Sequence, residues 1–314
     1  MKSSVKSKKT RKTLFLIALL AYPVLQWAVF WLYVNIQTIA LSFQRYNTAD
    51  GTYEFIWFDN YARLFKNHLK DPTMLHAFGN TFHSIGINAV ILPIAVVVAY
   101  AFFKKVRFER FFRVAFYLPS MVSVVVLTLC FKYMFNNSES VFVGPAAALM
   151  NKLGVNFKGW NVMESAGTVW RLVYVYAVWA GLGTNVIMLS GALNRIPRSI
   201  VESGKLDGVG FWRELVSVDL PLIMPTVATF ILTGVMSVFS FYMQPMLLSG
   251  VPGTFMSGAM YTIPWYIFDM TGGATTPLNI INATTTGLMF SLLMFPIIVL
   301  TKTLTDKLTP DVSF

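Results

Sequence analysis

The 314-residue chain is 55% apolar and only 12% charged, whereas an average soluble domain carries roughly 25% charged residues. This composition excludes an ordinary soluble domain and favours a membrane protein. The single cysteine, Cys130, excludes a disulfide within the chain and a cysteine-based metal site. The formal net charge of +11 would suit a nucleic-acid-binding protein only if the basic residues shared one exposed face.

The N-terminal segment 1–13 is basic, with six Lys or Arg residues and no acidic residue. The apolar run 14–34 is too long for the core of a cleaved signal peptide, and no small-residue cleavage site follows it. A helix needs about 20 apolar residues to cross a bilayer, so this run is predicted to be an uncleaved first span. Residues 35–79 predict a small structured external loop with one short helix around 60–67.

Five further apolar windows predict five more transmembrane helices. They are 80–103, 114–135, 172–193, 222–248 and 283–301. The last two belong to one nearly uncharged stretch, which a cluster of Gly, Pro and Thr between 249 and 277 divides. A short re-entrant or interfacial helix is predicted at 141–153 in the loop 136–168. The predicted fold class is therefore an all-α membrane protein with six transmembrane helices in a domain that spans 14–306.

The distribution of Lys and Arg predicts the orientation. With the N-terminus in the cytoplasm, 17 Lys or Arg residues fall in the inner segments and six in the outer loops. This excess is the positive-inside pattern of membrane proteins, and it predicts that both termini are cytoplasmic. Because the basic residues cluster at the ends of spans rather than on one face, the sequence argues against a nucleic-acid partner.

A polar interruption at 194–219, between the fourth and fifth spans, is predicted to be a cytoplasmic helix–turn–helix. Pro197 suits the first turn of a helix, which should end at Asp207-Gly208 because glycine tolerates the left-handed conformation. A second helix is predicted from about Val209, closed by Pro221 and Pro225. Its two sides should differ, with Phe211, Trp212, Leu215 and Val216 on one and Arg213 and Glu214 on the other. Such a pair is suited to docking on a partner protein, and the alternative is an interfacial helix on lipid headgroups.

Sequence motifs for catalysis or metal binding are absent. Ser203-Gly204-Lys205 is no phosphate-binding loop, since it lacks the upstream glycine and the following hydroxyl residue. The three histidines never stand four residues apart, and no nucleophile elbow occurs. We therefore predict a protein that is not an enzyme and has no metal site or cofactor. The predicted spans also hold almost no ionisable groups, which a proton- or sodium-driven carrier is expected to use, so another chain would power transport.

The segment 194–219, which we call the docking loop, resembles the signature loop of permease subunits in binding-protein-dependent ABC importers. That signature is usually E-A-A, three further residues, G, and later a hydrophobic residue followed by Pro. The residues that the resemblance assigns to the ATPase-coupling loop are Glu202, Ser203, Gly204, Asp207, Gly208, Phe211, Leu220 and Pro221. The chain departs from the family at Ser203-Gly204, where two alanines are usual, although both residues remain small.

Further motifs resemble the carbohydrate-uptake branch of this family. They are A-L-x-x-I-P at 192–197, L-D-G at 206–208, L-P-L-I-x-P at 220–225, Asn60-Tyr61, Asn80-Thr81, F-R-x-x-F-Y-L-P at 112–119, and Trp179. The match covers most of residues 57–225 in the right order, and it is weaker after Ser249.

The resemblance implies a division of labour between several chains. This chain would form half of the path for a sugar or oligosaccharide in the bacterial plasma membrane, paired with a second homologous permease. Two cytoplasmic ATP-binding subunits would bind the docking loops and hydrolyse ATP, and an extracellular solute-binding protein would deliver the sugar. The alternative is a membrane scaffold or membrane-embedded enzyme that recruits a cytoplasmic partner through the 194–219 loop.

Candidate residues for the substrate path are aromatic, amide and hydroxyl side chains, because sugars bind to aromatic faces and to paired polar groups. In the fourth and fifth spans they are Tyr174, Tyr176, Trp179, Asn185, Ser240, Tyr242 and Gln244. Each has an alternative role, since Trp and Tyr near span ends form the interfacial belt and polar side chains bond between helices.

Overall fold

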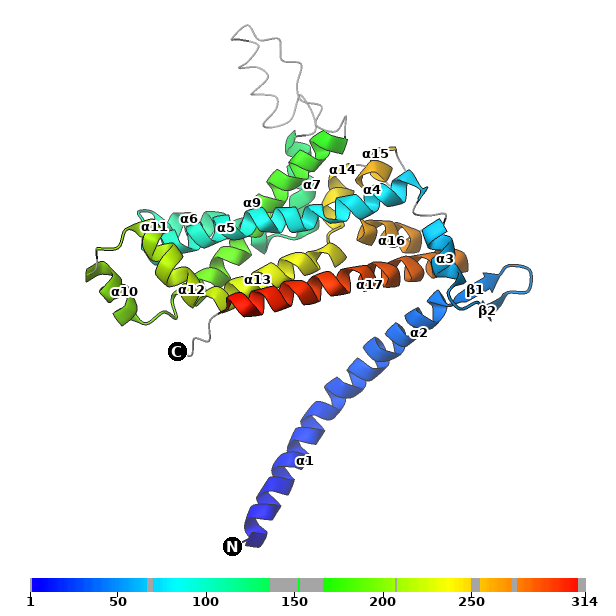
Figure 1. Cartoon of the computed structure of the whole chain (residues 1–314), viewed down its shortest axis with the longest axis horizontal. Coiled ribbons are helices and arrows are strands. Elements are labelled where there is room, and N and C mark those ends of the chain that lie inside the picture. The colour runs from blue at the N-terminus through cyan, green and yellow to red at the C-terminus, as the bar shows by residue number, and fades with distance from the viewer. Residues whose placement is uncertain are drawn as a thin grey trace. The chain divides into compact units, whose positions relative to one another are not determined.

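The computed structural model describes residues 2–66, 70–135, 152, 166–206, 208–249, 255–272 and 276–309, and most of these are helical (Figure 1). The chain forms two compact units, which we describe separately. The first contains Met1–Lys66 with Met270–Met289, and the second contains Asn67–Asp269 with Phe290–Phe314. The predicted helix at 141–153 lies outside the described residues.

The first unit begins with a long helix that is continuous through a π-helical turn. It consists of α1 (Lys2–Trp27), η1 (Ala28–Leu32) and α2 (Tyr33–Ser42). Residues 11–42 are long and apolar enough to cross a membrane. The predicted first span, 14–34, lies inside this helix, which extends further at both ends.

A short hairpin and a helix follow α2. Strands β1 (Gln44–Asn47) and β2 (Thr52–Phe55) pair antiparallel, with Tyr46 opposite Tyr53. The predicted fold class was all-α, so this hairpin was not predicted. The turn between them is closed by Gly51 at φ +66, a left-handed conformation that glycine adopts without strain. The predicted short helix is confirmed as α3 (Asp59–Lys66).

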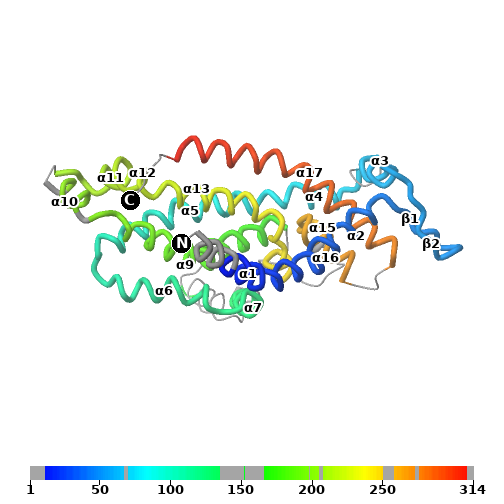
Figure 2. The backbone as a smooth tube through the Cα atoms, turned by 90° about the horizontal axis from the view of Figure 1, so that it is seen from below, coloured from blue at the N-terminus to red at the C-terminus, as the bar shows by residue number. Residues whose placement is uncertain are grey.

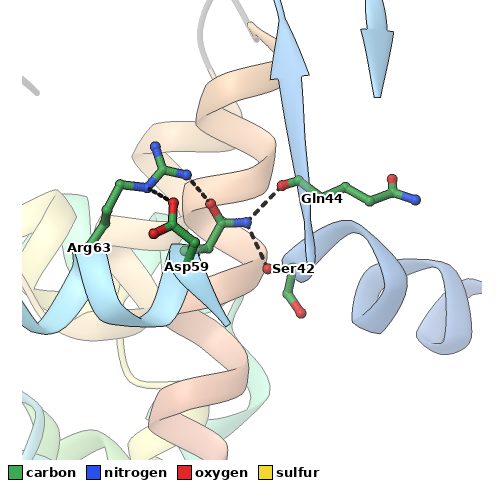
Figure 3. A network of polar contacts seen from close by, with 5 residues as sticks. Ser42, Gln44, Asp59 and Arg63 are labelled. Atoms are coloured by element: carbon green, nitrogen blue, oxygen red, sulfur yellow. Dashed lines mark hydrogen bonds and ion pairs between the residues drawn. The ribbon is translucent and has the colours of Figure 1, made fainter. Parts of the chain in front are cut away.

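The Asn60-Tyr61 motif ties α3 to the end of α2 (Figure 3). The Asn60 amide donates to the carbonyls of Ser42 and Gln44, at 2.8 and 2.7 Å. The Tyr61 and Ser42 hydroxyls lie 2.8 Å apart, and Arg63 contacts both Asn60 and Asp59. Asn60 is buried, so its amide satisfies backbone carbonyls where the helix ends and the strand begins.

The second unit is built around three helices that pack side by side. These are α5 (His83–Phe103), α9 (Ala166–Leu193) and α13 (Met224–Met236), and α6 (Glu109–Met121) packs on α9 (Figure 2). A Cβ atom on Gly183 of α9 would lie 2.4 Å from the Phe116 carbonyl oxygen of α6. Small residues allow this close approach, as is usual between membrane helices.

The Asn80-Thr81 motif anchors the end of α4 (Pro72–Thr81) to a later part of the chain. The Asn80 amide donates to the carbonyls of Ala259 and Tyr261, at 2.8 and 2.9 Å. The Thr81 hydroxyl accepts from the Ile263 backbone amide at 2.8 Å. These bonds hold α15 (Phe255–Met260) and the start of α16 (Ile263–Gly272) against α4.

Two predicted spans are bent rather than straight. The predicted span 114–135 is not one straight helix, since α6 and α7 (Val124–Phe135) meet at 105°. Val122 is extended between them and Pro119 lies in the last turn of α6, so the helical hydrogen bonds are interrupted there. The predicted span 222–248 is not one continuous helix either. In this segment α13 is followed by the 3-10 turn η4 (Ser237–Phe239) and then by a separate helix, α14 (Met243–Ser249).

The described helices provide between four and six candidate membrane spans. Four are unbroken, and each of two bent pairs, 109–134 and 211–239, could add one more. The predicted fourth and sixth spans are confirmed as helices but are longer, as α9 and as α17 (Pro277–Leu308). The mostly helical fold with several membrane-crossing helices is therefore confirmed.

Candidate functional site: the docking loop and a polar cavity

The docking loop contains two helical stretches on either side of a turn. Its first helix, α10, covers Arg198–Leu206, and Gly208 lies in the turn at φ +66. The second helical stretch consists of α11 (Phe211–Glu214), the π-helical turn η3 (Leu215–Asp219) and α12 (Leu220–Leu222). The left-handed glycine is confirmed, and Asp207 lies outside the described residues. Leu220 and Pro221 continue the helix instead of closing it.

The first helix of the loop presents polar groups to its surroundings. Glu202 and Ser203 are exposed, and the Ser203 hydroxyl donates to the Ser199 carbonyl at 2.9 Å. Among the described residues Glu202 takes part in none of the ion pairs. A Cβ atom on Gly204 would lie 3.9 Å from Glu214 Oε1, so the departure from alanine falls where the two helices of the loop meet.

Burial does not follow the predicted division of the second helix into two sides. Glu214, grouped with Arg213, is only 5% exposed, while Trp212, grouped with the buried Leu215, is 62% exposed. Phe211 does pack against the protein: its ring centroid lies 4.7 Å from that of Tyr100 in α5. The physical reason is an ion pair: Lys104 Nζ, just past the end of α5, lies 2.5 Å from Glu214 Oε1. This partner makes burial of the carboxylate possible.

A second carboxylate is buried beside this ion pair. Asp219 is 1% exposed, and neither of its oxygens has a hydrogen-bond partner within the described residues. Burial raises the pKa of Asp219 to about 6, the charge of Glu214 raises it too, and the charge of Lys104 lowers it. Two acidic side chains therefore lie beside one partly buried cation.

A depression of about 500 Å³ lies between the docking loop and the turn after α5. Its lining residues are Phe103, Lys104, Lys105, Asn194, Ile196, Val201 and Glu202. Lys105 and Phe108 both have positive φ, at 56° and 66°. Such conformations are costly for residues other than glycine, and here they fold the chain back tightly from α5 into α6.

A cavity of about 290 Å³ lies among the helices α5, α6, α7, α9 and the 241–244 segment. It contains two of the predicted substrate-path residues, Tyr176 and Gln244. Tyr176 itself is only 1% exposed, and its hydroxyl accepts a 2.8 Å hydrogen bond from Thr128. The sequence analysis missed Asn88, Ser120 and Thr184, which also line it. Each is a polar residue in an apolar run, and that pattern could have identified them.

The other candidate path residues lie elsewhere in the second unit. Trp179 packs on Phe131, with ring centroids 6.1 Å apart. The Asn185 amide donates to the Gly181 carbonyl at 2.8 Å, and Tyr242 packs on Phe268. Ser240 is exposed, and Tyr174 lies 2.8 Å from His83 Nδ1. None of them is among the residues lining the described cavity.

The described residues contain no group of three or more His, Cys, Asp or Glu side chains that could hold a metal ion. His83 instead stacks on Trp170, with ring centroids 4.2 Å apart.

Comparison with known proteins identifies the class to which this arrangement belongs. Residues 91–314 match the family described as binding-protein-dependent transport system inner membrane component. This match covers more than half of the chain, and the chain belongs to that family.

The most similar curated relatives include the arabinooligosaccharides transport system permease protein AraP of two bacteria. The Halalkalibacterium halodurans protein is 29% identical over 64% of this chain and 61% of its own length. The Bacillus subtilis protein is 27% identical over 67% and 64%, respectively. The matched part of the chain thus spans less than two thirds of either relative. Another relative is the sn-glycerol-3-phosphate transport system permease protein UgpA of Pectobacterium atrosepticum, 29% identical over 68% of both chains.

A solved structure shares the fold over almost the whole chain. It is a bacterial ABC transporter involved in the import of the acidic polysaccharide alginate, with a TM-score of 0.78 and 18% identity. The similarity covers 97% of this chain and all of that chain. At this identity it shows the fold alone.

Proposed function

We propose that this chain is a permease subunit of an ABC importer and forms half of the path for a sugar or an oligosaccharide. The observation that carries the proposal is the docking loop. Its α10 helix ends at a left-handed Gly208, exposes Glu202, and is backed by a second helix bonded to α5 through Lys104 and Glu214. A loop fixed in this way can transmit the movement of a bound partner to the spans.

The proposal includes the parts that the family implies. Two cytoplasmic ATP-binding subunits hydrolyse ATP and bind the docking loops of this chain and of a homologous permease, and a solute-binding protein delivers the sugar outside. The 79° bend at Ile223 supports placing Phe211–Leu222 in the cytoplasmic loop, with the fifth span beginning at α13. Six spans then place both termini in the cytoplasm. The relatives described above are named as transport permeases, which favours transport over the scaffold or membrane-enzyme alternative.

Two observations support a sugar or short oligosaccharide as the substrate: the names of relatives and the residues that line the cavity. Arabinooligosaccharides and diacetylchitobiose appear in the names of relatives, and both are short glycans. The 290 Å³ cavity is lined by apolar side chains together with the polar residues Asn88, Thr184 and Gln244, a mixture typical of small-molecule sites. We propose that this cavity is the part of the path that this chain contributes.

The test is copurification followed by reconstitution. The tagged chain should purify from membranes with a second permease, an ATP-binding subunit and bound glycan, and mass spectrometry identifies each. In proteoliposomes the complex should take up the identified glycan only with ATP inside and the binding protein outside.

A charge reversal at the exposed carboxylate refines this test. Glu202→Lys should lower ATP-dependent uptake by about tenfold or more, the scale for a misplaced charge at an interface. Glu54→Lys, on the exposed strand β2, is the matched control and should retain uptake. Uptake without ATP, or full activity of Glu202→Lys, would contradict the proposal.

A further inference from the structure

The cluster formed by Tyr100, Lys104, Glu214 and Asp219 is not explained by docking alone. It joins the end of α5 to the second helical stretch of the docking loop. Asp219 and the Tyr100 hydroxyl are both buried and both lack hydrogen-bond partners within the described residues. An unpartnered buried carboxylate destabilises a fold, so its presence here requires a reason.

The π-helical turn η3 explains how the two carboxylates come together. Glu214 and Asp219 are five residues apart, and an ordinary α-helix with 3.6 residues per turn would direct them to different faces. The wider turn of a π-helix, with the Leu220 amide bonded to the Leu215 carbonyl, brings residues five apart back toward one side. Such turns are rare within α-helices and are frequently found at functional sites.

The charges of the cluster leave one cation for two acids. Lys104 carries three donors on a flexible stem, and its bond in this structure goes to Glu214 at 2.5 Å. The groups that act on Asp219 are Lys104 and Tyr100 from α5 and Glu214 from its own helical stretch. The second acid is therefore an alternative partner for the same ammonium group.

We propose that Lys104 is a positioning residue for transport coupling that exchanges between Glu214 and Asp219, giving the docking loop two settings on the end of α5. The inference rests on the proposed function. In the setting seen here Lys104 holds Glu214, and neither Asp219 oxygen has a hydrogen-bond partner within the described residues. When the loop shifts, Lys104 releases Glu214 and bonds Asp219, so one acid is paired with the ammonium group in each setting. Two discrete, similarly satisfied arrangements are what a switching element requires.

The first experiment measures thermal stability of the purified subunit complex, without transport. Asp219→Asn removes a carboxylate that has no partner and should not lower the melting temperature. Glu214→Gln should lower it only slightly, because Lys104 can bond Asp219 instead. The double variant leaves Lys104 without an acid, and its loss should exceed the sum of the two single effects. Additive effects would overturn the exchange, whatever the transporter carries.

The second experiment measures ATP hydrolysis by the complete transporter in nanodiscs, with and without sugar-loaded binding protein. Asp219→Asn removes the second setting and should lower the stimulated rate at least about fivefold, while Glu214→Gln removes the resting setting and should raise the unstimulated rate by a similar factor. If the cluster only held the loop in one fixed position, both variants would change the stimulated and unstimulated rates in the same direction. That result would overturn the proposal. Absence of stimulation in the wild-type protein would instead contradict the proposed function, and the stability experiment would still decide the exchange.

Discussion

Gly208 and Gly210 stand two residues apart in the docking loop but have different backbone conformations. Gly208 is left-handed at φ +66, whereas Gly210 is extended at φ −70 and ψ 158. A Cβ atom would meet nothing within 4 Å at either position. Substitution therefore separates backbone strain from steric contact.

We expect Gly208→Val to lose coupling while Gly210→Val retains it. A β-branched residue at positive φ costs on the order of 1–3 kcal/mol, which is enough to displace the turn between the two docking helices. Gly208→Asn should retain most activity because asparagine tolerates the left-handed region. Binding-protein-stimulated ATP hydrolysis in vesicles measures the effect. Wild-type stimulation in Gly208→Val would show that the turn does not set the loop's geometry.

At the scale of elements, the packing of α6 on α9 depends on the absence of a side chain. Gly183 leaves room for the Phe116 carbonyl, which a Cβ atom would approach to 2.4 Å. Gly191, two turns further along α9, has no such neighbour within 4 Å. The two glycines form a matched pair within one helix.

Gly183→Ala is expected to destabilise the subunit by about 1–3 kcal/mol, the usual cost of overpacking. Gly191→Ala should leave the stability unchanged or raise it slightly, because alanine is the better helix former. The melting temperature in detergent, followed by fluorescence-detected gel filtration, measures both. An unchanged melting temperature for Gly183→Ala would mean that α6 and α9 do not pack this closely in the membrane.

The docking loop should have a pH-dependent stability that comes from Asp219. Its pKa is raised from 3.8 to about 6, so the folded state binds this proton more tightly than the unfolded chain. The associated stability is fully present below about pH 3.8 and is lost as the pH rises through about 6. Relative to Asp219→Asn, the wild-type protein should therefore lose thermal stability across this window and stay constant above it. A difference that is independent of pH would contradict the raised pKa.

At the scale of the whole molecule, the six-span arrangement makes a topological prediction. With Cys130 replaced by Ser, single cysteines at Ser3, Lys105 and Lys205 should resist an impermeant thiol reagent applied outside intact cells. Cysteines at Thr52 and Gly273 should react. Permeabilised cells provide the control, because the first three positions should then become reactive. Labelling of Lys205→Cys from outside would overturn both the orientation and the docking assignment.

The sequence by itself determined the class, the approximate positions of the helices and the docking loop. These depend on local properties: long apolar runs, proline and glycine at helix ends, and a motif read within some twenty residues. The left-handed Gly208 and the short helix α3 were predicted for that reason. Asn88 and Thr184 carried a similar local signal that was overlooked.

Only the tertiary structure decided which way polar groups face and where helices break. Glu214 is buried because Lys104, 110 residues earlier, meets it, and no periodicity within the loop encodes that partner. The 105° bend between α6 and α7 and the hairpin at 44–55 were not predicted either, although Pro119 and Gly51 mark them locally. Hydrophobic periodicity is a local property and predicts which side of a helix is apolar. Burial of a charged side chain depends on an oppositely charged partner, which can be far away in the sequence and comes close only when the chain folds.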